Sequence, residues 1–143
     1  MPAEDNKAIA RRFIEEVWNQ GNVSVVDELM DPNFVHHDPA SPHVSSREDY
    51  KQWIAETRTS FPDCHITIED LIEEGDRVVT RWTIRGTHKG AIISPMHIPA
   101  TGKQIAMAGM TITRAFGAKA VEDWHSSDAL GLMQQLGMIP TTR

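Results

Sequence analysis

The stretch from Lys103 to Gly137 decides the fold, and it reads KQIAMAGMTITRAFGAKAVEDWHSSDALGLMQQLG. Two runs with strand-like alternation stand on either side of Gly117, a spacing typical of a β-hairpin with a tight turn. Side chains that can carry protons or form hydrogen bonds gather where the second run ends: His125, Ser126, Ser127 and Asp128. We therefore expect a pocket where this hairpin curves over the rest of the chain.

Alternation divides this cluster between the two faces of a strand, because successive side chains point in opposite directions. His125 shares one face with Asp123, whereas Trp124 shares the other with Glu122 and Ser126. Only one of the two sets can therefore face a pocket.

Length and composition bound the protein class. With 143 residues and a mass of 16.0 kDa, residues 1–143 are predicted to form one domain with a core of its own. The net charge of -6 argues against nucleic acid as a partner, since phosphate binding needs a basic surface. We see no bilayer-spanning run and no signal peptide, and expect no membrane partner. Cys64 is the only cysteine, which excludes an intrachain disulfide and fits a cytoplasmic location.

The first part of the chain is predicted to be mainly helical. Apolar residues recur at helical spacing from Asn6 to Gln20 and again from Val23 to Met30. A turn at 31–33 and a short extended piece at 34–39 follow. A capping box at Ser46 then opens a third helix, which the sequence FPD terminates at 61–63.

The pattern changes at residue 65 from helical spacing to alternation. Strands are predicted at 65–69 and 77–88, before the hairpin, and a last helix from Ala129 to Leu136. Helices followed by a meander of about four antiparallel strands indicate an α+β fold, a curved antiparallel sheet with the N-terminal helices on its concave face. Such a sheet leaves a cone-shaped cavity suited to a small apolar ligand.

Several motifs closely resemble those of the SnoaL-like ester cyclases, polyketide cyclases of the wider NTF2-like superfamily. They are WNQGN at 18–22, FPD at 61–63, EGDRV at 74–78, GTH at 86–88, PATGK at 99–103, EDW at 122–124 and QQLG at 134–137. The resemblance extends from about Asn6 to Gly137. It implies the NTF2-like cone and the ring closure of a polyketide ester by an intramolecular aldol reaction.

The resemblance also implies positions for the site. An acidic acid/base residue of the family, near the end of the last strand, aligns with His125, and a family aspartate aligns with Asp128. Thr111 stands where the family has a histidine, and His36 falls near a family asparagine at the pocket mouth. Because the chain departs from the pattern at His125 and Thr111, another proton-transfer or hydrolytic reaction is an alternative to the aldol step.

The chemistry of these residues gives each of them a candidate role. A neutral imidazole, with an ordinary pKa near ~6.5, can take a proton from the carbon next to a carbonyl, so His125 is the candidate base. The alternative is a buried histidine bonded to a backbone carbonyl. Asp128 can cap the last helix, orient His125, or do both. His36 is the candidate hydrogen-bond donor at the mouth.

His36, His37 and Asp38 also raise the question of a metal. Neighbouring strand residues point to opposite faces, so only His36 and Asp38 could share a site. No second cluster with ligand spacing appears in the sequence. We expect neither a metal nor a cofactor.

Large side chains on the strands and the third helix are candidates for substrate binding. We expect this role for Trp53, Trp82, Met107, Thr111 and Trp124, although the tryptophans and methionine serve equally well as core. Apolar residues such as Val78 and Val79 occur on both strand faces. The second face therefore needs a cover, and a homodimer packed through the sheets is the simplest one.

Three functional hypotheses follow. The first is an enzyme of the ester cyclase type that acts on a small apolar carbonyl compound by proton transfer, or a dehydratase, isomerase or hydrolase of the same superfamily. The second is a non-catalytic protein that binds a small hydrophobic molecule. The third is a dimerisation module whose cone is filled by tryptophan and methionine side chains.

Overall fold

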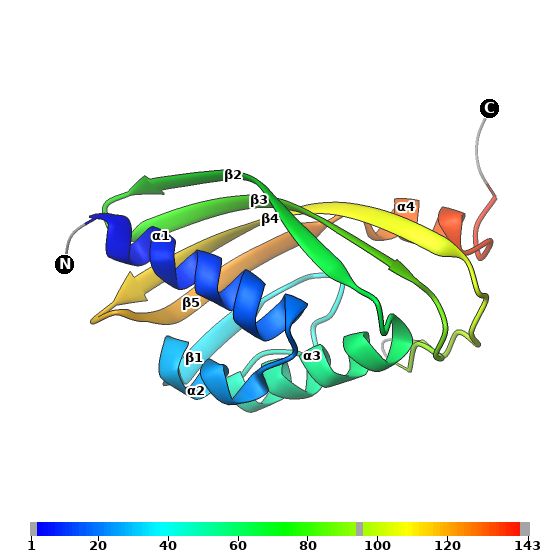
Figure 1. The fold of residues 1–143 in the computed structure, drawn as a ribbon, viewed down its shortest axis with the longest axis horizontal. Helices are drawn as coiled ribbons and strands as arrows, with labels where there is room; N and C mark the ends of the chain where they lie inside the picture. The colour runs from blue at the N-terminus through cyan, green and yellow to red at the C-terminus, as the bar shows by residue number, and fades with distance from the viewer. Residues whose placement is uncertain (1–2, 94–95, 141–143) are drawn as a thin grey trace.

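A curved sheet covered on one face by helices forms the molecule (Figure 1). The structure is a computed structural model, and it describes residues 3–93 and 96–140. The helical elements are α1 (Ala3–Arg12), a π-helical turn (Phe13–Asn19), a short 3₁₀ turn (Val23–Val25), α2 (Val26–Leu29), α3 (Arg47–Ser60) and α4 (Ala129–Gln135). The strands are β1 (Met30–His37), β2 (His65–Glu74), β3 (Arg77–Thr87), β4 (Gln104–Phe116) and β5 (Lys119–Ser127). This arrangement confirms the predicted α+β class.

The sheet differs from the predicted antiparallel meander in one strand. Its order is β1-β5-β4-β3-β2, and β1 pairs with β5 in parallel, so the sheet is mixed. The sequence at 30–37 was expected to be a helix end, a turn and a short extended piece. Pro32 cannot continue a helix, and the register of β1 shifts between Met30 and Val35, so an irregular edge strand forms there instead.

The hairpin of β4 and β5 forms as predicted. Gly117 and Ala118 both have positive φ, of 60° and 65°, which is the geometry of a type I′ turn. The register shifts by one residue between Ala115 and Arg114, as at a β-bulge, and beyond this shift Thr111 faces His125 and Ile112 faces Trp124. The hairpin therefore sends Thr111 and His125 to the concave face together.

The third helix begins with the predicted capping box. The Ser46 hydroxyl accepts a hydrogen bond from the Asp49 backbone N–H at 3.1 Å, and the Asp49 carboxylate accepts one from the Ser46 N–H at 3.2 Å. The helix lies under the sheet beside the π-helical turn, and the fully buried Ile54 and Val17 belong to the core between them. None of the helices in residues 3–93 and 96–140 is long and apolar enough to cross a membrane.

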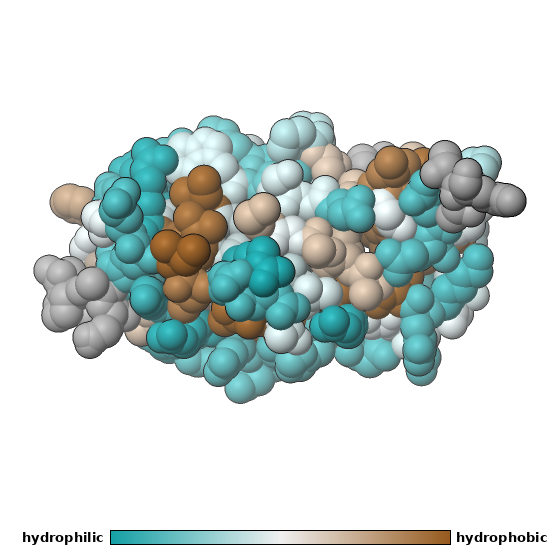
Figure 2. Space-filling model, turned by 90° about the horizontal axis from the view of Figure 1, so that it is seen from above, coloured by the Kyte–Doolittle hydropathy of each residue, from teal (hydrophilic) through white to brown (hydrophobic). Residues whose placement is uncertain are grey.

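The outer face of the sheet carries no helix of the N-terminal layer. Figure 2 looks down on the molecule from this side and shows hydrophobic patches separated by hydrophilic side chains. Ile72, Val79, Ile112 and Trp124 stand in register on four adjacent strands. Ile72 is 60% exposed and Ile112 is 36% exposed, so an apolar row crosses this face open to solvent.

Candidate functional site

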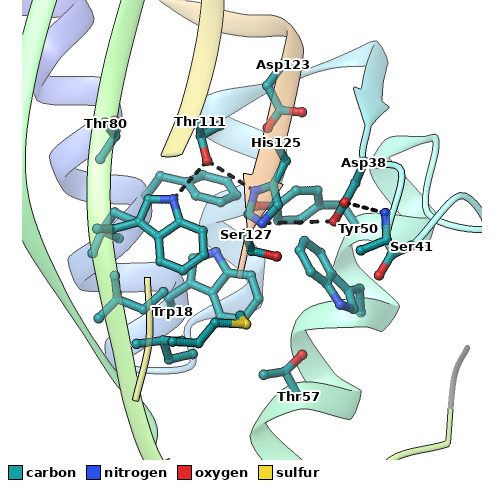
Figure 3. A pocket seen from close by; sticks show the side chains of 18 of the residues that line it. Trp18, Asp38, Ser41, Tyr50, Thr57, Thr80, Thr111, Asp123, His125 and Ser127 are labelled. Carbon is teal, nitrogen blue, oxygen red and sulfur yellow. Dashed lines mark hydrogen bonds and ion pairs between the residues drawn. The ribbon is translucent and has the colours of Figure 1, made fainter. Parts of the chain in front are cut away.

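A cavity of about 400 Å³ lies between the concave face of the sheet and the helices. Its wall is mainly apolar, with aromatic side chains from the helices and methionine and isoleucine from the strands. Figure 3 shows polar side chains around it that come from β3, β4, β5, α3 and the loop after β1. Lining residues include Phe13, Trp18, Tyr50, Trp53, Trp82 and Met107. A cavity of this size remains open, so the hypothesis of a filled cone is wrong.

The parallel pairing of β1 with β5 brings two histidines and two carboxylates onto one wall. His36 stands in register with Asp123, and two residues further along the strands Asp38 lies next to His125. Each histidine therefore faces the carboxylate of the neighbouring strand. The two imidazole rings lie 5.6 Å apart between centroids, so the two pairs form one cluster.

His125 is held in place by aromatic rings and by a hydrogen-bond chain. Its ring lies 5.1 Å from that of Trp82 and 5.5 Å from that of Trp53. The indole N–H of Trp82 donates to Oγ1 of Thr111 at 3.0 Å, and the same oxygen lies 3.1 Å from Nδ1 of His125. Nε2 points the other way, 4.0 Å from Oδ2 of Asp38 (Figure 3).

His125 is neutral at physiological pH. Burial lowers its pKa to about 4 from the ordinary 6.5, because the charged imidazolium loses its hydration. The negative charge of Asp38 raises the pKa and the neighbouring His36 lowers it, but burial outweighs both. A neutral imidazole has one nitrogen that donates and one that accepts a hydrogen bond, which suits it to proton transfer.

The second pair is more deeply buried. Nδ1 of His36 lies 2.5 Å from Oδ1 of Asp123, and both side chains are almost inaccessible to water. Burial raises the pKa of Asp123, although the hydrogen bond from His36 pulls it down. Tyr50, with its ring 5.1 Å from that of His36, has a pKa well above its ordinary value, chiefly through burial and then through the charge of Asp123.

The structure corrects the predicted position of His36. It lies under the aromatic rings of Phe34, Tyr50 and Trp53 and is only 3% exposed, so it is not at the mouth of the pocket. The hydrogen bond to Asp123 draws it inward. His37 points to the opposite side, where its Nε2 lies 2.7 Å from Glu122.

Asp128 is the N-cap of α4, which was one of the two roles predicted for it. Its carboxylate accepts a hydrogen bond from the N–H of Gly131 at 2.9 Å. Among the described residues, Asp128 makes no hydrogen bond or ion pair with His125, whose imidazole nitrogens are flanked by Thr111 and Asp38.

Four of the five predicted binding residues line the cavity: Trp53, Trp82, Met107 and Thr111. Trp124 does not, because alternation turns it to the outer face of β5. Its ring stacks on that of His37 at 5.5 Å, and the guanidinium of Arg77 lies 5.0 Å from its centroid. Ligand binding by the four cavity residues stays a prediction.

Asp38, Asp123, Tyr50 and Ser127 also line the cavity, and the sequence assigned none of them a catalytic or substrate-binding role. A sequence signal for the first two exists in retrospect. One strand reads His36-x-Asp38 and its neighbour reads Asp123-x-His125, the same pattern reversed. Within residues 3–93 and 96–140, no three histidine, cysteine or acidic side chains come together in a way that could hold a metal ion.

Comparison with known proteins agrees with this geometry. Residues 8–136 match the family described as SnoaL-like polyketide cyclase. No protein with a curated function matches the chain.

Solved structures resemble the chain over nearly its whole length. A "putative polyketide cyclase" from Acidithiobacillus ferrooxidans is 35% identical, with a TM-score of 0.82 over 93% of this chain and 94% of its own. TsrD from Streptomyces laurentii is 26% identical, with a TM-score of 0.85 over 97% of this chain and 99% of its own. IdmH from Streptomyces antibioticus, also described as a "putative polyketide cyclase", is 30% identical. Its TM-score is 0.78, and the match covers 92% of this chain and 98% of IdmH. The chain therefore belongs to the SnoaL-like polyketide cyclase family, and its α+β fold, a curved sheet packed against helices, is the NTF2-like cone.

Proposed function

We propose that the protein is an enzyme of the ester cyclase type that moves a proton on a small apolar carbonyl compound without a cofactor. The observation that carries the proposal is the pair formed by His125 and Asp38, whose Nε2 and Oδ2 atoms lie 4.0 Å apart in the wall of an apolar cavity. Enolate chemistry needs a base for the proton and a hydrogen-bond donor for the oxygen, and this pair offers both.

The charge of the cavity wall supports an uncharged ligand. Three carboxylates line it, from Asp38, Glu56 and Asp123, while no lysine or arginine of the described chain does. An anionic ligand would be repelled and would find no guanidinium or ammonium partner there. A ketone or an ester is therefore favoured over a free carboxylic acid, and a polyketide-like ester is compatible with the description of related proteins as "putative polyketide cyclase".

A binding protein without catalysis is the second candidate. The extent of the apolar lining favours it, because a cavity of about 400 Å³ with aromatic walls holds a small hydrophobic molecule whether or not a reaction follows. A ligand that raises the melting temperature but is recovered unchanged would support this candidate.

The experiment that separates the two uses 2-tetralone, a planar apolar ketone, in D2O. Exchange of the hydrogens next to its carbonyl is followed by NMR. We expect catalysed exchange by the wild type and a loss on the order of 10²- to 10⁴-fold in His125→Phe. His43→Phe, at an exposed histidine outside the cavity, is the matched control and should leave exchange unchanged. Full exchange by His125→Phe would remove His125 from the mechanism.

We also propose that the outer face of the sheet packs against a second copy of the chain. The apolar row from Ile72 to Trp124 supports this arrangement, and so does the 54% exposure of Met110 beside it. Ion pairs flank the row, such as the one between Arg81 and Asp70 at 2.6 Å in the next row of the sheet, and give the face the mixed character of a protein interface.

A further inference from the structure

The hydrogen bonds around Thr111 favour one of the two ring nitrogens of His125 as the carrier of the proton. A hydroxyl has one proton and two lone pairs, and an indole N–H can only donate. Trp82 therefore donates to one lone pair of Thr111, and the Thr111 proton is available to donate to Nδ1 of His125 at 3.1 Å. In this arrangement Nδ1 is the acceptor, and the proton of the neutral ring is on Nε2.

The carboxylate on the other side of the ring favours the same tautomer. With the proton on Nε2, the N–H dipole points at Oδ2 of Asp38, 4.0 Å away. With the proton on Nδ1, a nitrogen lone pair would face the carboxylate, and Thr111 would receive two N–H groups. Both ends of the ring therefore favour the Nε2–H form.

Two polar atoms at this point of the wall are left for a ligand. Oδ1 of Asp38 accepts the N–H of Ala40 at 2.9 Å, but within residues 3–93 and 96–140 neither Oδ2 nor Nε2 of His125 has a hydrogen-bond partner. Both residues line the cavity. A gap of 4.0 Å is too long for a hydrogen bond between the two groups, so each can instead contact a ligand lying beside them.

We propose that Asp38 is the general base of this site and that His125 acts as a neutral hydrogen-bond donor. The assignment rests on the proposed function, and it differs from the sequence-based expectation of His125 as base. The lone pair of Nδ1 is occupied by Thr111, whereas Oδ2 of Asp38 has lone pairs free on the cavity side. Thr111 and Trp82 are positioning residues, because they act through the tautomer of His125.

The step balances without a further reactant. Oδ2 of Asp38 takes a proton from the carbon next to the carbonyl, and the C–H electron pair becomes the C=C bond of the enolate. The carbonyl oxygen takes the negative charge and accepts the Nε2–H of His125. In ring closure the enolate carbon attacks a second carbonyl, and the proton on Asp38 passes to the new alkoxide, which restores the carboxylate.

The test begins with the tautomer, which needs no substrate. Long-range proton–nitrogen NMR of ¹⁵N-labelled protein at neutral pH reports which ring nitrogen is protonated, and His125→Phe assigns the signal. We expect the Nε2–H form in the wild type and in Thr111→Ser, and a mixture of tautomers in Thr111→Val. Thr113→Val is the matched control, because Thr113 lines the cavity on the same strand and should leave the tautomer unchanged. An Nδ1–H form in the wild type would overturn the assignment.

The base is then tested with the exchange of 2-tetralone. Asp38→Asn keeps an oxygen for the Ala40 N–H but removes the base, so exchange should fall on the order of 10²- to 10⁴-fold while the melting temperature stays close to that of the wild type. His125→Gln keeps an N–H donor and should retain more activity than His125→Phe. Undiminished exchange by Asp38→Asn would overturn the base assignment and leave the proposed function intact. If even the wild type catalyses no exchange, both the base assignment and the proposed function are contradicted, whichever tautomer the NMR shows.

Discussion

The stability of the protein should rise with pH through His125, and the size of the effect follows from its burial. The folded pKa is about 4 and the ordinary value is 6.5. Between these two values the unfolded chain binds the proton that the folded chain rejects, so the free energy of unfolding increases with pH. The contribution is fully present above about pH 6.5 and is lost as the pH falls towards 4. At 1.36 kcal/mol for each pKa unit, it amounts to roughly 3 kcal/mol.

Asp123 acts in the opposite direction. Its pKa is raised in the folded state, so its contribution is present below the unfolded pKa and is lost as the pH rises through the folded one. The total stability curve mixes the two effects, but the difference between the wild type and His125→Phe isolates the histidine. Urea unfolding from about pH 4 to pH 7.5 measures that difference.

His65→Phe is the matched control, because His65 is exposed on β2 and its variant should run parallel to the wild type. NMR titration of the His125 ring gives an independent measurement of the folded pKa. A titration midpoint near 6.5, or a difference between wild type and His125→Phe that does not change with pH, would refute the burial argument.

Three further predictions concern packing and assembly. Gly109→Ala should cost about 1–3 kcal/mol of unfolding free energy in urea, because the new Cβ would lie 2.3 Å from Cζ2 of Trp82; a Trp82→Phe background should relieve only part of the cost. Asp123→Leu should cost about 1–3 kcal/mol, since it leaves the His36 N–H without an acceptor, whereas Asp123→Asn keeps an acceptor and should cost less in the same assay. Ile112→Glu should convert a dimer to a monomer in analytical ultracentrifugation, and a wild type already monomeric would contradict the proposed interface.

Local sequence patterns were enough to predict most of the fold. Val78, Thr80, Trp82 and Ile84 alternate along β3 and therefore share one face, and all four side chains are buried. Capping boxes and glycine turns depend on a few neighbouring residues, so they can be recognised from the sequence without knowledge of the tertiary structure. Alternation also places Trp124 on the face opposite His125, so the expectation that both residues contact the ligand conflicted with it, and Trp124 does not line the cavity.

Other features depend on partners that are distant in the sequence. Asp31-Pro32-Asn33 has the composition of a turn, and only pairing with β5 makes it part of a strand. A histidine next to a histidine gives no indication of which will be buried. The hydrogen bond from His36 to Asp123 joins residues 87 positions apart, and it is this contact that takes His36 away from the expected mouth of the pocket.

The parallel pairing of β1 with β5 is therefore the feature of the fold that creates the candidate site. In a parallel pair, residues at equal spacing along both strands stay opposite one another, so His36-x-Asp38 beside Asp123-x-His125 produces two histidine–carboxylate pairs instead of one. An antiparallel partner in the same place would have set histidine against histidine. The buried pair holds a carboxylate close to a ring nitrogen at 2.5 Å, while the pair at the cavity keeps its two polar atoms 4.0 Å apart and open to a ligand. The same residue types thus give one structural contact and one candidate for proton transfer, and the difference lies in whether the gap admits a substrate atom.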